Sequence, residues 1–234
     1  TNAYEPELLK PNPSSNANKL KPWSLEFTWK KAEHSAAESY RLVVHESPQG
    51  GKACSDTNIV FNQVVAQGIG SDTVGQTYSH TVSLKQDKEY SYAVLPVGPN
   101  GSTKLGYQSF CGTVFETKRE QSTAVAPAGP NQTHVLPQSL SPSAPTTLTL
   151  GWTQVKNASR YALAVSSDKA MTQNLLDPSQ RMVVGDTNTS KVVSLPPSQT
   201  GVLYWTVTPI GPIALGEEMG LPSEPSSFVI NPEL

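Results

Sequence analysis

The stretches "YAVLPVGP" at residues 92–99 and "YWTVTPIGP" at residues 204–212 are two versions of one short segment. Both combine aromatic and β-branched residues, which favour strands, and both then enter a turn that contains Pro and Gly. About half of the 234-residue chain separates them. A strand that recurs at this distance predicts two domains built on one plan, because the chain is long enough for two domains of ordinary size.

The sequence around these stretches repeats in the same order. Three further pairs of segments correspond between the halves: "SLEFTWKK" (24–31) with "TLTLGWTQV" (147–155), "SYRLVVHE" (39–46) with "RYALAVSS" (160–167), and "GTVFETK" (112–118) with "PSSFVINP" (225–232). The aligned residues include Trp29 with Trp152 and Tyr40 with Tyr161. The repeat therefore covers nearly all of both halves.

Apolar residues alternate with polar ones in these segments, so each segment has one apolar face. Leu25, Phe27 and Trp29, for example, share a face. Half-buried strands pair into sheets, and two facing sheets cover each other's apolar faces. We therefore expect an all-β chain of two consecutive sandwiches, each of about seven strands. The expected core anchors are Trp29, Tyr40, Val94, Trp152, Tyr161 and Trp205.

Composition supports this fold class and excludes some functions. Charged residues make up only 15% of the chain, and 20 Pro and 16 Gly favour short strands and many turns over helices. The net charge is −2 and Lys and Arg are scattered, so there is no basic face for nucleic acid. No apolar stretch approaches the roughly 20 residues that span a bilayer. We expect neither a nucleic-acid partner nor a membrane span.

A boundary is expected near the middle of the chain. The stretch "KREQSTAVAPAGPNQ" is polar, contains proline and lacks periodicity, as linkers do. It predicts a linker around residues 118–130, between a first domain at 1–120 and a second at 121–234.

Two local features predict departures from a minimal sandwich. Pro96 and Pro209 lack the N–H that a central strand needs, so the strand should end early or bulge at each of them. The segments at 46–76 and 166–190 are long, and each should hold an additional strand and an irregular loop.

A Trp at the end of the second strand, a Tyr that opens the third, and Leu-x5-Tyr before the sixth resemble the fibronectin type III family. Leu84 and Tyr90 fit the last pattern, and the resemblance implies a tyrosine corner, in which the hydroxyl bonds the backbone of the preceding turn. In the second half Leu203 stands at the corner position and Tyr204 follows it, so that corner should be altered or absent. The stretch from 195 to 228 is similar to type III and immunoglobulin-like repeats on bacterial surface proteins.

The chain has two cysteines, Cys54 and Cys111, without metal-ligand spacing or a C-x-x-C motif. In an exported protein the expectation is a disulfide between them, whereas a cytosolic protein would keep two free thiols. The chain begins at Thr1 and shows no apolar signal segment, and we expect an exported, extracellular or cell-surface protein.

Catalytic and metal-binding motifs are missing from the sequence. None of the four histidines stands in a recognised catalytic arrangement, and H-E-x-x-H, G-x-S-x-G and phosphate-cradling loops are all absent. The adjacent Glu217 and Glu218 lack the alternating oxygen ligands of a calcium loop, so a solvated loop tip is favoured over a Ca²⁺ site. We expect no enzyme activity and no cofactor.

Two functional hypotheses from different classes follow. The first is a non-catalytic structural or adhesion module, a subunit or decorating component of a surface filament or matrix, whose partners are other protein chains. The segment at 1–18, with Leu8 and Leu9 as apolar anchors, is a candidate for a strand donated to another chain. The alternative for this segment is simply the first strand of its own domain.

The second hypothesis is a receptor-type module that binds a glycan or a protein through loops at the end of a sandwich. Trp23 and Tyr107 lie outside the strand pattern and are the candidate contacts, although packing at the edge of the core is favoured for them. Four N-x-[ST] sequons, weak evidence in so Ser/Thr-rich a chain, are possible glycosylation positions: Asn100, Asn131, Asn157 and Asn188.

Overall fold

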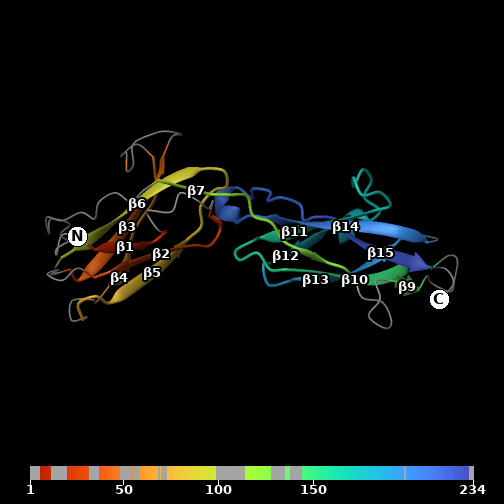
Figure 1. The fold of residues 1–234 in the computed structure, drawn as a ribbon, viewed down its shortest axis with the longest axis horizontal. Coiled ribbons are helices and arrows are strands. Elements are labelled where there is room, and N and C mark those ends of the chain that lie inside the picture. The colour runs from red at the N-terminus through yellow and green to blue at the C-terminus, as the bar shows by residue number, and fades with distance from the viewer. Residues whose placement is uncertain are drawn as a thin grey trace. The chain divides into compact units, whose positions relative to one another are not determined.

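A computed structural model describes most of the chain, and almost all of the regular structure in it is β. The chain divides into two compact units, Thr1–Lys118 (unit 1) and Arg119–Leu234 (unit 2) (Figure 1). None of the helices in the described part has the length and apolar character needed to cross a membrane. The described residues are 6–11, 20–31, 37–47, 54, 58–67, 69, 73–98, 114–127, 135–137, 144–197 and 199–231.

Unit 1 has two antiparallel sheets. The three-stranded sheet has the order β1-β2-β5, with strands β1 (Glu7–Lys10), β2 (Leu25–Lys30) and β5 (Thr77–Val82). The four-stranded sheet has the order β4-β3-β6-β7, with strands β4 (Ile59–Gln67), β3 (Ser39–Ser47), β6 (Glu89–Val97) and β7 (Phe115–Glu116).

The core of unit 1 lies between these sheets, because strands of both contribute to one apolar cluster. Trp29 on β2 and Tyr40 on β3 are fully buried and meet edge to face, with ring centroids 5.9 Å apart. Val94 on β6 is also fully buried. The alternation in β2 accounts for this, since Leu25, Phe27 and Trp29 face inward while Glu26 is exposed.

Unit 2 repeats this plan with one strand more among the described residues. Its smaller sheet has the order β13-β10-β8, with strands β13 (Ser190–Leu195), β10 (Thr146–Trp152) and β8 (Ala124–Val125). The larger sheet has the order β12-β11-β14-β15-β9, with strands β12 (Met182–Val184), β11 (Arg160–Ser166), β14 (Gly201–Ile210), β15 (Ser226–Asn231) and β9 (Val135–Pro137). β9 runs parallel to β15. The described loops of unit 2 contain two short 3-10 helices, η3 (Pro178–Gln180) and η4 (Ile213–Leu215).

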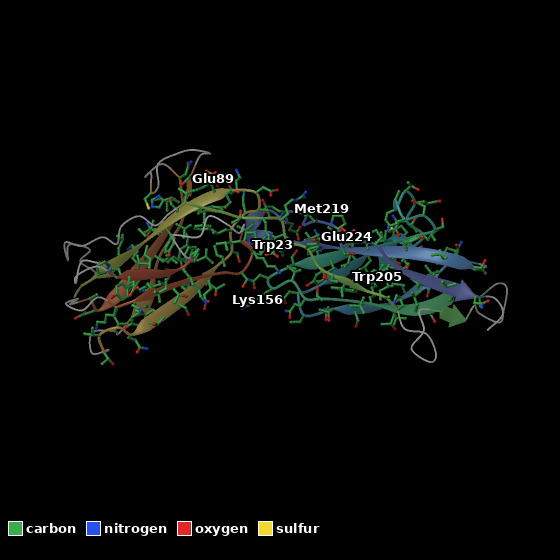
Figure 2. The ribbon with its side chains drawn as sticks, viewed as in Figure 1. Trp23, Glu89, Lys156, Trp205, Met219 and Glu224 are labelled. Carbon is green, nitrogen blue, oxygen red and sulfur yellow. The ribbon has the colours of Figure 1, made fainter. Side chains whose placement is uncertain are left out.

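The core of unit 2 places the aligned residues in the same relation. Trp152 on β10 packs against Tyr161 on β11, with ring centroids 5.3 Å apart. Trp205 on β14 is fully buried and lies 6.5 Å from Trp152, and Figure 2 shows it among the strands of the unit. Trp29 and Trp152 therefore occupy matching environments, each against the first tyrosine of the following strand.

The expectation that both proline-containing strands end early or bulge is wrong. β6 runs through Pro96, which pairs with Tyr40, and β14 runs through Pro209, which pairs with Tyr161. Pro209 lies beyond the end of the neighbouring strand β15, whose pairing with β14 ends at Trp205. On that side of β14 the partner of Pro209 is a donor, since the Gly220 N–H donates to the Pro209 carbonyl at 2.8 Å. A missing N–H is tolerated at such positions.

Part of the expected linker is built into the two units. The Lys118 N–H donates to the Leu20 carbonyl in unit 1, and the Leu221 N–H donates to the Glu120 carbonyl in unit 2. The Ser122 hydroxyl donates to the Thr153 carbonyl at 2.6 Å, and β8 follows directly. Polar composition suggested a linker here because β8 is too short to show an alternating pattern.

Candidate functional site

In the described part of the chain, the side chains that could have served catalysis or metal binding have structural roles instead. No group of three or more His, Cys, Asp or Glu that could hold a metal ion occurs among them. His45 is buried, and His80 lies against the Phe61 ring, with centroids 5.5 Å apart. Burial lowers the pKa of His80 below its ordinary value. His34 and His134 lie outside the described residues.

Glu217 is not the solvated loop tip that the sequence suggested. Its carboxylate accepts from the Arg160 guanidinium at 2.6 Å and from the Ser159 hydroxyl at 3.3 Å. The Glu217 backbone has a positive φ of 55°, and its N–H donates to the Pro212 carbonyl. The loop thus folds back onto β11, and the ion pair fastens it there. Sequence gave no indication of this pair, because Arg160 and Glu217 are far apart in the chain.

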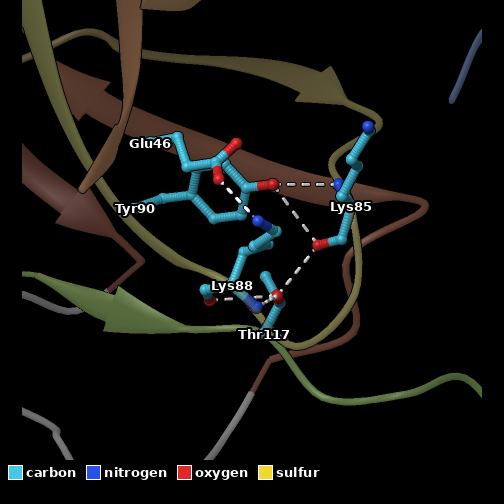
Figure 3. Close-up of polar contacts among 5 residues, drawn as sticks. All are labelled: Glu46, Lys85, Lys88, Tyr90 and Thr117. Carbon is cyan, nitrogen blue, oxygen red and sulfur yellow. Dashed lines mark hydrogen bonds and ion pairs between the residues drawn. The ribbon is translucent and has the colours of Figure 1, made fainter. Parts of the chain in front are cut away.

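Tyr90 shows the hydrogen-bond geometry of a tyrosine corner (Figure 3). Its hydroxyl accepts from the Lys85 N–H at 3.1 Å and donates to the Lys85 carbonyl at 3.4 Å, while Leu84 is buried in the core. The Thr117 hydroxyl also donates to the Lys85 carbonyl, at 2.9 Å. The turn is therefore held from β6 on one side and from the end of β7 on the other. The resemblance did not point to Thr117.

In unit 2 a tyrosine on another strand anchors a different turn, the one between β10 and β11. Leu203 is buried and Tyr204 half-buried, whereas the Tyr161 hydroxyl accepts from the Val155 N–H at 2.8 Å and donates towards the Asp186 carbonyl at 3.0 Å. Burial raises the pKa of Tyr161. The signal was present in the sequence, since Val155-x5-Tyr161 has the same spacing as Leu84-x5-Tyr90.

The Cys54 N–H donates to the Ser91 hydroxyl at 2.8 Å. Cys111 lies outside the described residues. The pairing of these two cysteines stays a prediction.

The candidate partner contacts that the structure describes belong to the sandwich of unit 1. Leu8 lies in β1 opposite Trp29 and packs against the core of its own unit, and Leu9 beside it is half-buried. Residues 7–10 thus form the first strand of their own sandwich, which was the alternative to a donated strand. Trp23 is fully buried, and Tyr107 lies outside the described residues.

One edge of the four-stranded sheet of unit 1 is formed by β4, which sequence reasoning did not single out as a site. Within the described residues β4 pairs only with β3, so its outer side has no strand partner. Its nine residues, "IVFNQVVAQ", contain no charge, no proline and no glycine. Ile59 and Val60 are each 46% exposed. Two bulges, at Val60 and Val65, flank the regular run from Phe61 to Val64.

The matching edge of unit 2 is covered. The Asn174 side chain donates to the Leu163 carbonyl at 3.1 Å and accepts from the Val165 N–H at 3.2 Å, so it pairs with β11 as a strand would. β12 completes the edge with only three residues. The Lys191 ammonium donates to the Met182 carbonyl of β12 at 2.9 Å. A short edge strand, a covering loop and a lysine are recognised protections against pairing with other chains.

Comparisons with known proteins name no family. No protein-family model matches the chain, and no curated protein matches it in sequence. Among solved structures it is similar to "Biofilm associated protein - BSP domain", at 13% identity over 97% of this chain and 29% of that chain, with a TM-score of 0.25. It is also similar to "D0-D1 domain of Intimin", at 12% identity over 90% of this chain and 94% of that chain, with a TM-score of 0.25. This chain spans less than a third of the first structure's length, and at these TM-scores neither likeness supports a functional statement.

Proposed function

We propose that the chain is a non-catalytic extracellular module with a structural or adhesive role, which works by binding other protein chains as part of a surface filament or matrix. The observation that carries this proposal is the uncharged edge of β4, which has no strand partner among the described residues. An open edge of this kind binds an extended chain through main-chain hydrogen bonds. An edge strand of nine uncharged residues favours association with another protein chain.

The polar side chains of unit 2 support a structural role. The Thr172 hydroxyl donates to Asp168 at 2.6 Å and the Ser166 hydroxyl donates to it at 2.8 Å, and these bonds lower the pKa of the Asp168 carboxyl. The Ser179 N–H and hydroxyl lower the pKa of Asp177 in the same way. Both carboxylates thus hold loops in place, and their lowered pKa values do not suit general acid–base work near neutral pH.

The receptor-type alternative loses part of its support. Trp23, one of its two candidate contacts, is fully buried. We therefore put the β4 edge ahead of the sandwich-end loops.

Immunogold labelling of intact cells of the source tests the proposal. An antibody raised against the purified chain should decorate material outside the cell, and negative-stain images should place the label on a filament or matrix. Antibody absorbed with the purified chain is the control and should leave the cells unlabelled. Label found only after the cells are permeabilised would contradict an extracellular role.

A further inference from the structure

The two sheets of unit 1 meet along one side through a contact between β4 and β5. These strands belong to different sheets and lie side by side, as Figure 1 shows. The rings of Phe61 on β4 and His80 on β5 face each other there, with centroids 5.5 Å apart. Both side chains are half-buried, and His80 lies on the core side of its sheet because it alternates with the exposed Ser79 and Thr81.

A lysine occupies the matching position of unit 2. His80 and Lys191 each stand four residues before an aligned leucine, Leu84 or Leu195. Each also pairs with the residue two positions before the tryptophan of the neighbouring strand. The Lys191 ammonium donates to the Met182 carbonyl of β12 at 2.9 Å, so a side chain at this position joins the two sheets in both units. Lysine keeps its charge near neutral pH, whereas histidine gains or loses a proton in that range.

The strands that pack against His80 offer no carboxylate to a protonated ring within the described part of the chain. β4 has no charged or titratable residue along its nine positions. On β5 the other titratable side chain is Tyr78. The charged residues of β2 lie on the outer face of its sheet and form ion pairs with β1: Lys10–Glu26 and Glu7–Lys30.

The charged groups of β3 are engaged elsewhere. β3 contacts β5 through the Tyr40 ring, whose centroid is 5.6 Å from that of Tyr78. His45 alternates to the outer face of its sheet, and the remaining charged side chains of β3 have partners: Arg41 with Asn62, and Glu46 with Lys88. An imidazolium at position 80 would thus lose hydration without gaining a carboxylate partner among the described residues.

We propose that the contact between β4 and β5 is a pH-sensitive device: neutral His80 packs on Phe61 and holds β4 against β5, and protonation at mildly acidic pH releases β4. Unit 2 keeps its contact through the same range, because Lys191 stays charged. The device goes beyond the proposed function, since it acts within unit 1 and needs no partner chain.

The direction of the His80 titration agrees with this device. Burial lowers the pKa of His80, because the packed position favours the neutral ring. Attraction between an imidazolium and the Phe61 ring would act in the opposite direction and raise that pKa. The sign of the shift therefore separates a contact that protonation releases from one that it strengthens.

NMR titration of His80 in the full chain is the first test. The pKa should lie below 6.5, and the nuclear Overhauser contacts between the His80 and Phe61 rings should disappear as His80 becomes protonated. Phe61→Leu and Phe61→Ala should raise the pKa towards 6.5, the alanine variant more, because less of the imidazole is then covered. Val60→Ala is the matched control on the same strand, since Val60 is 46% exposed, and should leave the pKa unchanged.

Hydrogen exchange of the β4 amides, corrected for the intrinsic effect of pH, measures the release. Their protection should fall between about pH 7.5 and about pH 5.5. The fall should be at most about tenfold, the limit for a group one pH unit below its ordinary pKa of 6.5. His80→Gln should abolish the fall, and the β12 amides of unit 2 should show none.

A pKa of His80 at or above 6.5, or one that responds equally to the Phe61 and Val60 variants, would overturn the proposal. So would β4 protection that stays constant with pH in the unsubstituted chain, or that still falls in His80→Gln. The exchange measurement needs no Phe61 variant, so it decides the matter even if circular dichroism shows that those variants do not fold.

Discussion

Unit 1 and unit 2 bury the same pair of side chains but anchor their turns with different tyrosines. Trp29 packs on Tyr40 and Trp152 packs on Tyr161, at 5.9 and 5.3 Å between ring centroids. The tyrosine hydroxyls, however, hold different turns: Tyr90 on β6 holds the turn between β5 and β6 in unit 1, and Tyr161 on β11 holds the turn between β10 and β11 in unit 2. The apolar contact is the shared feature of the fold, whereas the polar anchor holds a different turn in each unit.

The lateral edges differ in a related way. The segment after the third strand forms the nine-residue β4 in unit 1, whereas in unit 2 it forms a covering loop and the three-residue β12. Both solutions complete the same sandwich. The comparison shows that residues outside the repeated strands decide how each unit meets its surroundings.

The largest expected effect breaks the shared contact. Trp29→Ala and Trp152→Ala should each lower the free energy of unfolding by about 3–5 kcal/mol, through lost burial and the cavity left behind. Because each unit has a core of its own, each substitution should shift only the unfolding transition of its own unit. Denaturant unfolding, followed by hydrogen exchange in each unit, measures this.

Substitution of Trp29 or Trp152 by Phe tests the same contact with a smaller loss of side-chain volume. The indole nitrogens of Trp29 and Trp152 have no hydrogen-bond partner in the described part of the chain, so phenylalanine removes volume and no polar contact. Both units should lose less stability than with alanine. Loss confined to one tryptophan would show that the two environments are not equivalent.

The tyrosine anchors should give a smaller and unequal loss. Tyr161→Phe leaves the buried Val155 N–H without its acceptor and should cost about 1–3 kcal/mol of unfolding free energy. Tyr90→Phe frees only the part-buried Lys85 backbone and should cost about 1 kcal/mol. Tyr204→Phe is the control and should change little. Equal losses for Tyr204 and Tyr161 in thermal melts would remove the anchor assignment.

The smallest expected effect is a difference in pH dependence. Burial lowers the pKa of His80 below its ordinary 6.5, so the unfolded chain binds more protons than the folded chain just below that pH. Unit 1 should therefore lose stability as the pH falls from 6.5 towards the folded pKa of His80. His80→Gln should remove this slope in urea unfolding followed across pH.

The carboxylates of unit 2 affect stability at lower pH than His80 does. Hydrogen bonds from the hydroxyls of Thr172 and Ser166 hold the pKa of Asp168 below 3.8. These bonds therefore stabilise the folded state above that pH, and the stabilisation is lost as the pH falls through the folded pKa of Asp168. Thr172→Val should raise the pKa of Asp168 measured by NMR titration, while Ser179→Ala should not. If the unfolding free energy of unit 2 changed between pH 5 and 6.5 as steeply as that of unit 1, this division would be contradicted.

Much of the fold could be predicted because it depends on local periodicity. The alternation around Trp29 and Trp152 indicates an inward face without reference to any distant residue. The cover over β11 could not be predicted, since Asn174 acts through its side chain and gives no pattern. The course of β14 through Pro209 also depends on where β15 stops, which no local sequence reports.

What the amino-acid order determines by itself is which side of each strand is apolar, and from this come two sandwiches with a tryptophan against a tyrosine in each. Only the tertiary structure decides which hydroxyl reaches which turn, and which sheet edge has no strand partner among the described residues. The physical reason is that burial and hydrogen bonding differ in their range along the chain and in the geometry that they tolerate. Burial of an apolar face is non-directional and follows from spacing along the chain. A hydrogen bond needs donor and acceptor within a few tenths of an ångström of about 2.9 Å, and the partners here come from distant segments.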